Sequence, residues 1–286
     1  MVIARAVVRD LYEGVEIAKV FSSLMLISGV APVIAPLFGA QLLHVTDWRG
    51  VFVALAVLGL LLVLLVVRSL PESLEPAARR RRGVGLGEMG KLLRDRIFVG
   101  CLIAASGAFA AFFAYLAASP FVLQDLYGAS PQTYALLFGL NAVGMVGVGQ
   151  LNGRLLVGKF PVHAIVTAGL ALLTLAGVAL LALATGRLGT PGLAPVCVVL
   201  FVLVSSLGLL IGNANALAMN RTKHAAGAAS ALLGASSFLI GALVSPLAGI
   251  SAGATPMALI QTIAAAAALT GFTVLTRGRP AGADSE

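Results

Sequence analysis

The chain has little charge of either sign, since Asp, Glu, Lys and Arg together make up 10% of its 286 residues. It carries 11 acidic residues, and none of them lies in the middle of an apolar stretch. Hydrophobic residues make up 59% of the chain and the mean hydropathy is +1.03. Such a composition leaves too little polar surface for a water-soluble globule, so it argues against a soluble enzyme and favours a membrane protein.

Cysteine and histidine are scarce as well, with two and three copies. Cys101 and Cys197 lie inside apolar stretches with no Cys or His at ligand spacing, so we expect packing residues, no disulfide framework and no metal site. His44, His163 and His224 lie at the ends of such stretches, where solvation at the membrane interface is the simplest interpretation. A membrane-embedded enzyme needs a nucleophile and base, or metal ligands, at one depth. The pattern argues against that class, and no cofactor is expected.

Eight stretches are long and apolar enough to cross a membrane, because a hydrocarbon core ~30 Å thick requires ~20 such residues per helix. They are Ile17–Leu43, Gly50–Arg68, Phe98–Leu116, Gln132–Leu151, Ala164–Ala184, Ala194–Leu217, Ala225–Ile250 and Met257–Leu275. Met1–Tyr12 is too short to span and is interpreted as the end of a further helix. The sequence therefore predicts an all-α polytopic membrane protein.

The basic residues lie almost entirely on one side of these predicted spans. Of the 19 Lys and Arg residues, only Arg49 and Arg187 fall on the other side, which is the positive-inside pattern. The pattern predicts that Arg79–Arg82 and the C-terminus are cytoplasmic. The net charge is +8, but the basic residues are not interleaved with aromatic residues as on a nucleic-acid-binding surface. We therefore expect the bilayer as partner, with contact to anionic lipids, and no nucleic acid.

Glycine and proline form stripes within the spans. Gly29, Pro32, Pro36 and Gly39 recur at spacings of three or four, and the two prolines permit a bend. Small residues let membrane helices approach closely, so this stripe predicts a packed seam against the six spans that follow Arg79–Arg82. Further seams are expected at a second set of glycines, which comprises Gly139, Gly144, Gly147, Gly149, Gly227, Gly234 and Gly241.

Six segments of the chain share their pattern with one group of membrane transporters. They are Arg5–Tyr12, Ser28–Ala40, Trp48–Phe52, Leu70–Leu74, Phe113–Gln124 and Gly227–Gly234. Together they resemble the Bcr/CflA drug-resistance group of the major facilitator superfamily. Ser28–Ala40, which holds the stripe, is similar to the antiporter motif of that group's fifth helix, with Ala40 where a second Gly is usual. The others are similar to the end of the fourth helix, the two ends of the sixth, the seventh and the eleventh, in chain order.

The resemblance implies a major facilitator fold that lacks roughly its first three helices, with eight full spans plus a partial one. It divides the chain into a remainder of the N-terminal bundle (1–70), a central cytoplasmic loop (71–96), a C-terminal six-helix bundle (97–276) and a cytoplasmic tail (277–286). It implies a multi-pass bacterial inner-membrane transporter that exchanges small amphipathic drugs for protons by alternating access. An inactive, truncated remnant is the alternative, because the family's first-helix acidic residue has no counterpart here.

Candidate site residues are few. The resemblance makes Arg9 and Asp10 candidates for a cytoplasmic gate, and Asp125 is the acid nearest to a span, with a possible proton or gating role. Polar residues inside spans are the candidates for a substrate cavity, although hydrogen bonds between helices explain each of them equally well. These residues are Tyr115, Asn141, Asn213 and Asn215.

The topology makes a direct prediction. A cysteine introduced at position 81, with Cys101 and Cys197 replaced by Ala, should react with membrane-permeant maleimide and not with an impermeant reagent added outside intact cells. Labelling of this cysteine from outside would contradict the predicted orientation.

Overall fold

The computed structural model describes residues 35, 38–39, 41–70, 86–186, 192–220, 225–250 and 253–277. The chain divides into two compact units, Met1–Gly83 and Val84–Glu286, and each is treated by itself. Within the described residues, seven helices are long and apolar enough to cross a membrane. This confirms an all-α polytopic membrane protein. The predicted span Ile17–Leu43 and the partial helix before it lie mostly or entirely outside the described residues.

The first unit contributes α3 (Trp48–Ser69), which matches the predicted span Gly50–Arg68. Asp47 caps this helix by accepting a hydrogen bond from the backbone N–H of Gly50 at 3.0 Å. The guanidinium of Arg49 lies 4.3 Å from the centre of the Trp48 ring. A tryptophan beside an arginine is typical of a helix end at the membrane–water interface.

The second unit contains six long helices: α5 (Arg96–Pro120), α6 (Pro131–Leu151), α7 (Val162–Ala184), α8 (Leu193–Asn220), α9 (Ala226–Ala248) and α10 (Ala254–Thr276). A short helix, α4 (Leu86–Leu92), precedes them. The π-helical turns η2 (Phe121–Leu126) and η3 (Asn152–Leu156) continue α5 and α6. The spans agree with those predicted, except that α5 and α6 with their continuations run ten and five residues beyond the expected ends at Leu116 and Leu151.

Local sequence explains where these helices begin. The Asp95 carboxylate accepts hydrogen bonds from the backbone N–H groups of Ile97 and Phe98, so α5 starts directly after it. Ser130 caps α6 in the same way through the N–H of Thr133, and Pro131 occupies the first helical position. Each cap satisfies backbone donors that the first helical turn leaves unpaired.

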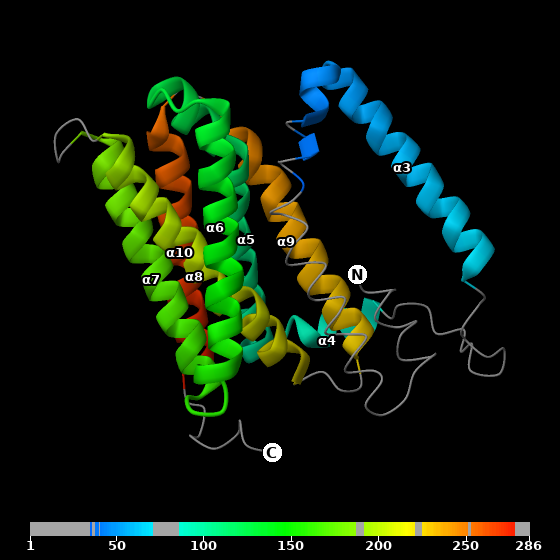
Figure 1. Cartoon of the computed structure of the whole chain (residues 1–286). Coiled ribbons are helices and arrows are strands. Elements are labelled where there is room, and N and C mark those ends of the chain that lie inside the picture. Colours follow the sequence, from blue (N-terminus) through cyan, green and yellow to red (C-terminus); the bar gives the residue numbers. More distant parts are fainter. Residues whose placement is uncertain are drawn as a thin grey trace. The chain divides into compact units, whose positions relative to one another are not determined.

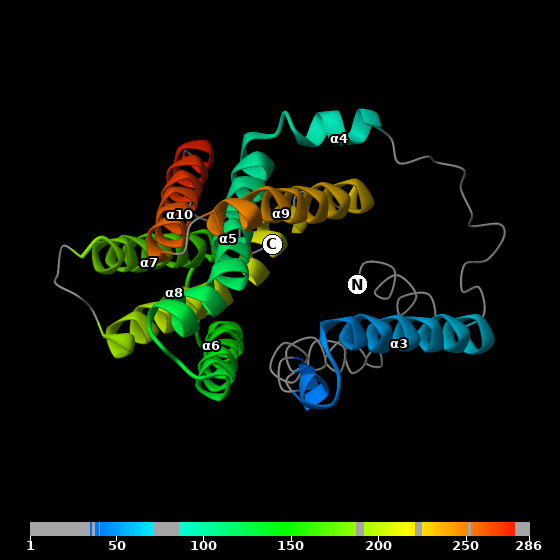
Figure 2. The same cartoon turned by 90° about the horizontal axis from the view of Figure 1, so that it is seen from above.

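The six helices form two rows of three (Figures 1 and 2). In one row α5 lies between α9 and α10, and in the other α8 lies between α6 and α7. The rows meet where α5 packs on α8 and where α7 packs on α10. The helices α5–α7 and α8–α10 therefore occupy equivalent places, as expected of two three-helix repeats.

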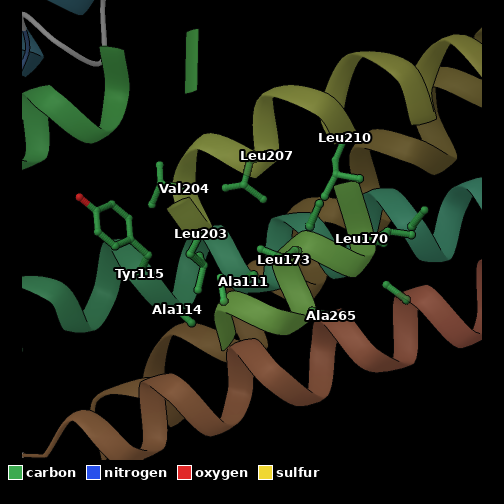
Figure 3. Packing of buried hydrophobic residues seen from close by; sticks show 14 of the residues in the cluster. Ala111, Ala114, Tyr115, Leu170, Leu173, Leu203, Val204, Leu207, Leu210 and Ala265 are labelled. Carbon is green, nitrogen blue, oxygen red and sulfur yellow. The ribbon is translucent and has the colours of Figure 1, made fainter. Parts of the chain in front are cut away.

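The core lies where the two rows meet (Figure 3). Leu170 and Leu173 of α7 pack with Leu203 and Leu207 of α8, and all four side chains are fully buried. The α5 side of this core is built from alanines, among them Ala108, Ala111 and Ala114. Small side chains on this central helix let its neighbours pack close to it, which is how helices associate where lipid removes the hydrophobic drive.

Glycines allow the closest crossings. A Cβ atom at Gly208 of α8 would clash with the carbonyl group of Met145 on α6, so the two backbones touch there. Gly144 packs against Phe201, Gly149 against Gly208 and Gly241 against Phe113, as the predicted seams require. The prediction is wrong within this unit for four other positions, since a Cβ atom added at Gly139, Gly147, Gly227 or Gly234 would meet nothing within 4 Å.

We expect Gly208→Val to lower stability strongly, because the branched side chain would force α6 and α8 apart. Overpacking typically costs ~1–3 kcal/mol. Gly212→Val is the matched control, since it lies one turn along α8 and has open space where its side chain would be. Thermal unfolding of the purified chain in detergent measures the difference, and equal loss in both variants would contradict a tight crossing at Gly208.

Candidate functional site

The structure brings two predicted cavity residues into direct contact. The Asn141 side-chain amide on α6 donates a hydrogen bond to the Tyr115 hydroxyl on α5 at 3.0 Å. Both side chains are buried, with exposed fractions of 4% and 1%. Tyr115 lies 19 residues into α5 and Asn141 10 residues into α6. A buried polar pair of this kind is stable because each group finds a partner where water is absent.

Aromatic rings hold the pair in place. The Tyr115 ring stacks on Phe138 of α6 at a centroid distance of 5.8 Å and an interplanar angle of 16°. Tyr134, one turn earlier on α6, lies 6.0 Å from Phe138, and its hydroxyl is 3.2 Å from the Ser119 hydroxyl on α5. The two helices are thus joined by two polar contacts with an aromatic stack between them.

A cavity of about 240 Å³ adjoins Asn141 and lies between α6 and α8. Its wall is otherwise apolar and includes Leu137 and Leu140 of α6 and Cys197 and Phe201 of α8. One amide among apolar and aromatic side chains is the common composition of a small-molecule site. Cys197, which the sequence suggested as a packing residue, is half-buried and lines this cavity, whereas Cys101 is fully buried.

The remaining predicted residues do not join this group. The side-chain amides of Asn213 and Asn215 donate to the carbonyl groups of Leu209 and Ile211 on their own helix, both at 2.8 Å. Asp125 is exposed in η2 and lines a separate cavity of about 210 Å³ beside α9. Their predicted roles stay predictions.

Other predicted site residues fall where the structure gives little or no description. Arg9, Asp10, Gly29, Pro32 and Pro36 lie outside the described residues. Gly39 is described in the first unit, where an added Cβ atom would meet nothing within 4 Å. The gate and the antiporter seam therefore stay predictions.

Sequence reasoning missed one buried polar residue. Gln261 of α10 is fully buried, and its amide donates to the carbonyl of Ala111 on α5 at 3.2 Å. Its side-chain oxygen has no hydrogen-bond partner among the described residues. Gln261 is the only long polar side chain in the predicted span Met257–Leu275, and that isolation was the available signal. It links α10 to α5 within one row, whereas the Tyr115–Asn141 bond links α5 to α6 across the two rows.

His163 also has a more specific setting than interfacial solvation. Its ring stacks on Phe272 of α10 at 4.9 Å, and Nε2 lies 2.6 Å from the Thr276 hydroxyl. The Thr276 hydroxyl also lies 2.6 Å from the carbonyl oxygen of Phe272. The contact joins the start of α7 to the end of α10.

The family model for the Major Facilitator Superfamily matches residues 1–246. The chain belongs to the major facilitator superfamily. It is thus a multi-pass protein of the bacterial inner membrane, in a family of transporters rather than enzymes.

Named relatives agree with this membership. An MFS-type transporter of Bacillus subtilis, YdgK, is 37% identical over 98% of the chain, which covers 70% of that protein. A bicyclomycin resistance protein homolog of Haemophilus influenzae is 28% identical over 86% of the chain and is covered over 62% of its length. The multidrug resistance protein MdtL of Salmonella heidelberg is 27% identical over 82% of the chain and is covered over 57%. The predicted drug-resistance group of the superfamily is confirmed.

The Tyr115–Asn141 bond should be measurable by a double-mutant cycle. We expect Tyr115→Phe and Asn141→Leu to be coupled by ~0.6–1.7 kcal/mol, the usual range for a hydrogen bond between membrane helices. Unfolding in detergent with increasing sodium dodecyl sulfate gives the free energies of the wild type and three variants. Additive effects would show that the two side chains do not interact.

Proposed function

We propose that this chain, acting with a complete N-terminal bundle, exports small amphipathic drug-like compounds across the inner membrane. The observation that carries the proposal is the apolar cavity of about 240 Å³ with the Asn141 amide in its wall. Apolar and aromatic walls accept varied substrates, and a single amide gives them one hydrogen-bonding partner. The relatives named for bicyclomycin and multidrug resistance support this choice of substrate class.

The Tyr115–Asn141 bond gives the site a means of responding to substrate. The amide has one acceptor and two N–H donors, and the bond to Tyr115 uses one donor. A substrate in the cavity can take the other donor or the carbonyl oxygen while the pair stays intact. A substrate that displaced Tyr115 would instead loosen the contact between α5 and α6, which links occupancy to helix position.

We further propose that export is coupled to proton entry, as in drug:proton antiport by alternating access. In the described part of the chain, Asp125 is the one carboxylate within the candidate spans, and it lies at the outer end of the α5–η2 helix. Two bundles must enclose a site for alternating access, and the six helices of the second unit supply one of them. We therefore expect the 286-residue chain expressed by itself to give no resistance, which is the behaviour of the alternative, an inactive remnant.

The site is tested by binding. We expect Asn141→Leu to weaken binding of a fluorescent amphipathic cation, such as ethidium, to the purified chain about fivefold, the effect of one lost hydrogen bond. Gln150→Leu is the matched control, because Gln150 is exposed at the end of the same helix. Equal binding by the two variants would place the substrate elsewhere.

Transport is tested in an efflux-deficient host. We expect drug resistance when the chain is joined to three upstream helices from the Bacillus relative, and loss of that resistance with a proton uncoupler. Resistance that survives the uncoupler would contradict proton coupling. No resistance from a chimera that is expressed and inserted would favour the remnant.

A further inference from the structure

A larger cavity of about 550 Å³ lies between α5, α9 and α10, away from the α6–α8 side where the candidate site is found. Its aliphatic side chains include Leu102 and Ile103 of α5, Ile240 and Val244 of α9 and Ile260 and Ile263 of α10. We call this cavity the α5–α9–α10 groove. With no aromatic ring in its lining, the groove suits a flexible alkyl chain better than a flat drug-like ring.

The polar side chains in the groove are already satisfied. Ser106 of α5 donates a hydrogen bond to Ser236 of α9 at 3.2 Å, and Ser236 donates to the carbonyl of Leu233. Both hydroxyl hydrogens are used within the bundle, so the lining offers no free donor to a polar ligand. The groove therefore selects for an apolar occupant along its length.

Two arginines stand at one end of the groove. Arg96 begins α5 and lies seven residues before Ile103, so both are on one side of the helix. Arg277 directly follows α10, where Thr276 packs against Gly100 one turn after Arg96. Both arginines are exposed, and neither forms an ion pair within the described part of the chain.

The acidic groups near this end are engaged elsewhere. The Asp95 carboxylate accepts the backbone N–H groups of Ile97 and Phe98 as the cap of α5. Glu88 of α4 pairs with Lys91 at 3.0 Å. The two guanidinium groups at the groove therefore form a site for an anion, and guanidinium binds phosphate oxygens in bidentate geometry.

The spacing of the two features fits one lipid. Along α5 the groove runs from ~9 Å to ~21 Å beyond Arg96, from Leu102 to Ala110, at 1.5 Å per residue. Each leaflet contributes ~15 Å to the thickness of the hydrocarbon core. An acyl chain whose headgroup lies at Arg96 therefore enters the groove and follows it to the middle of the bilayer.

We propose that the α5–α9–α10 groove binds one anionic phospholipid of the leaflet on the basic side of the membrane. Its phosphate lies between Arg96 and Arg277, and one acyl chain fills the aliphatic groove. The helix α5 also carries Tyr115 of the candidate site. A bound lipid would therefore help to hold α5 against α9 and α10. The proposal does not depend on the transported substrate.

Photo-crosslinking tests the site. The purified chain is reconstituted in phosphatidylcholine vesicles that contain, at equal mole fraction, either phosphatidylglycerol or phosphatidylcholine with a photoactivatable group halfway along one acyl chain. Peptide mass spectrometry then locates the labelled residues. We expect phosphatidylglycerol to label the groove segments of α5, α9 and α10 at least about fivefold more than phosphatidylcholine, the contribution of one arginine near a membrane surface.

Three variants separate the two parts of the site. Arg96→Gln and Arg277→Gln should each remove most of the preference for phosphatidylglycerol. Ala267→Phe, from an exposed position in the groove lining, should reduce labelling by both lipids, because the ring occupies the path of the acyl chain. Arg154→Gln is the matched control, since it removes one exposed charge at the same end of the bundle, in η3, away from the groove.

Each alternative outcome overturns the proposal. Equal labelling by the two lipids would show that the groove does not recognise the anionic headgroup. An equal effect of Arg154→Gln and Arg96→Gln would indicate general surface attraction rather than a site. Absence of groove labelling in the wild type, with labelling elsewhere on the chain, would show that protein covers the groove.

Discussion

Close approach of helix backbones is the constraint on which the second unit depends. Lipid is as apolar as leucine, so these helices gain little from burying apolar side chains against one another and must gain from packing instead. Gly208 lies directly on the backbone of α6, and Gly107 lies on Ala264 and Ala268 of α10. These contacts set the separation of α6 from α8 in one row and of α5 from α10 in the other.

The candidate site is a consequence of those separations. The 3.0 Å bond between Asn141 and Tyr115 requires α6 to lie close to α5, and α6 is held by its contacts with α8. The cavity lies along the same pair of helices, between Leu140 of α6 and Phe201 of α8. A change at Gly208 would therefore reach the site without touching it.

The bundle uses few polar groups inside the membrane, and several of them join one helix to another. Asn141 joins α6 to α5, Gln261 joins α10 to α5 and Ser106 joins α5 to α9. Each bond ends on α5, which is the central helix of its row (Figure 2). The helix that carries Tyr115 is thus fixed by hydrogen bonds to three neighbours, whereas Asn213 and Asn215 bond within α8.

The sequence by itself determined the elements of this protein. Apolar length sets where each span lies, because a helix must cross ~30 Å of hydrocarbon, and caps such as Asp95 and Ser130 set where α5 and α6 begin. Only the tertiary structure decided which polar residues meet. Tyr115 and Asn141 were candidates on separate helices, and Gln261 was not recognised. Gly139 was expected to pack, but an added Cβ atom there would meet nothing within 4 Å among the described residues of its unit. Hydropathy shows which residues lie within a membrane span. It does not show which neighbouring helix a side chain faces, because the helix crossings are set by contacts between residues far apart in the chain.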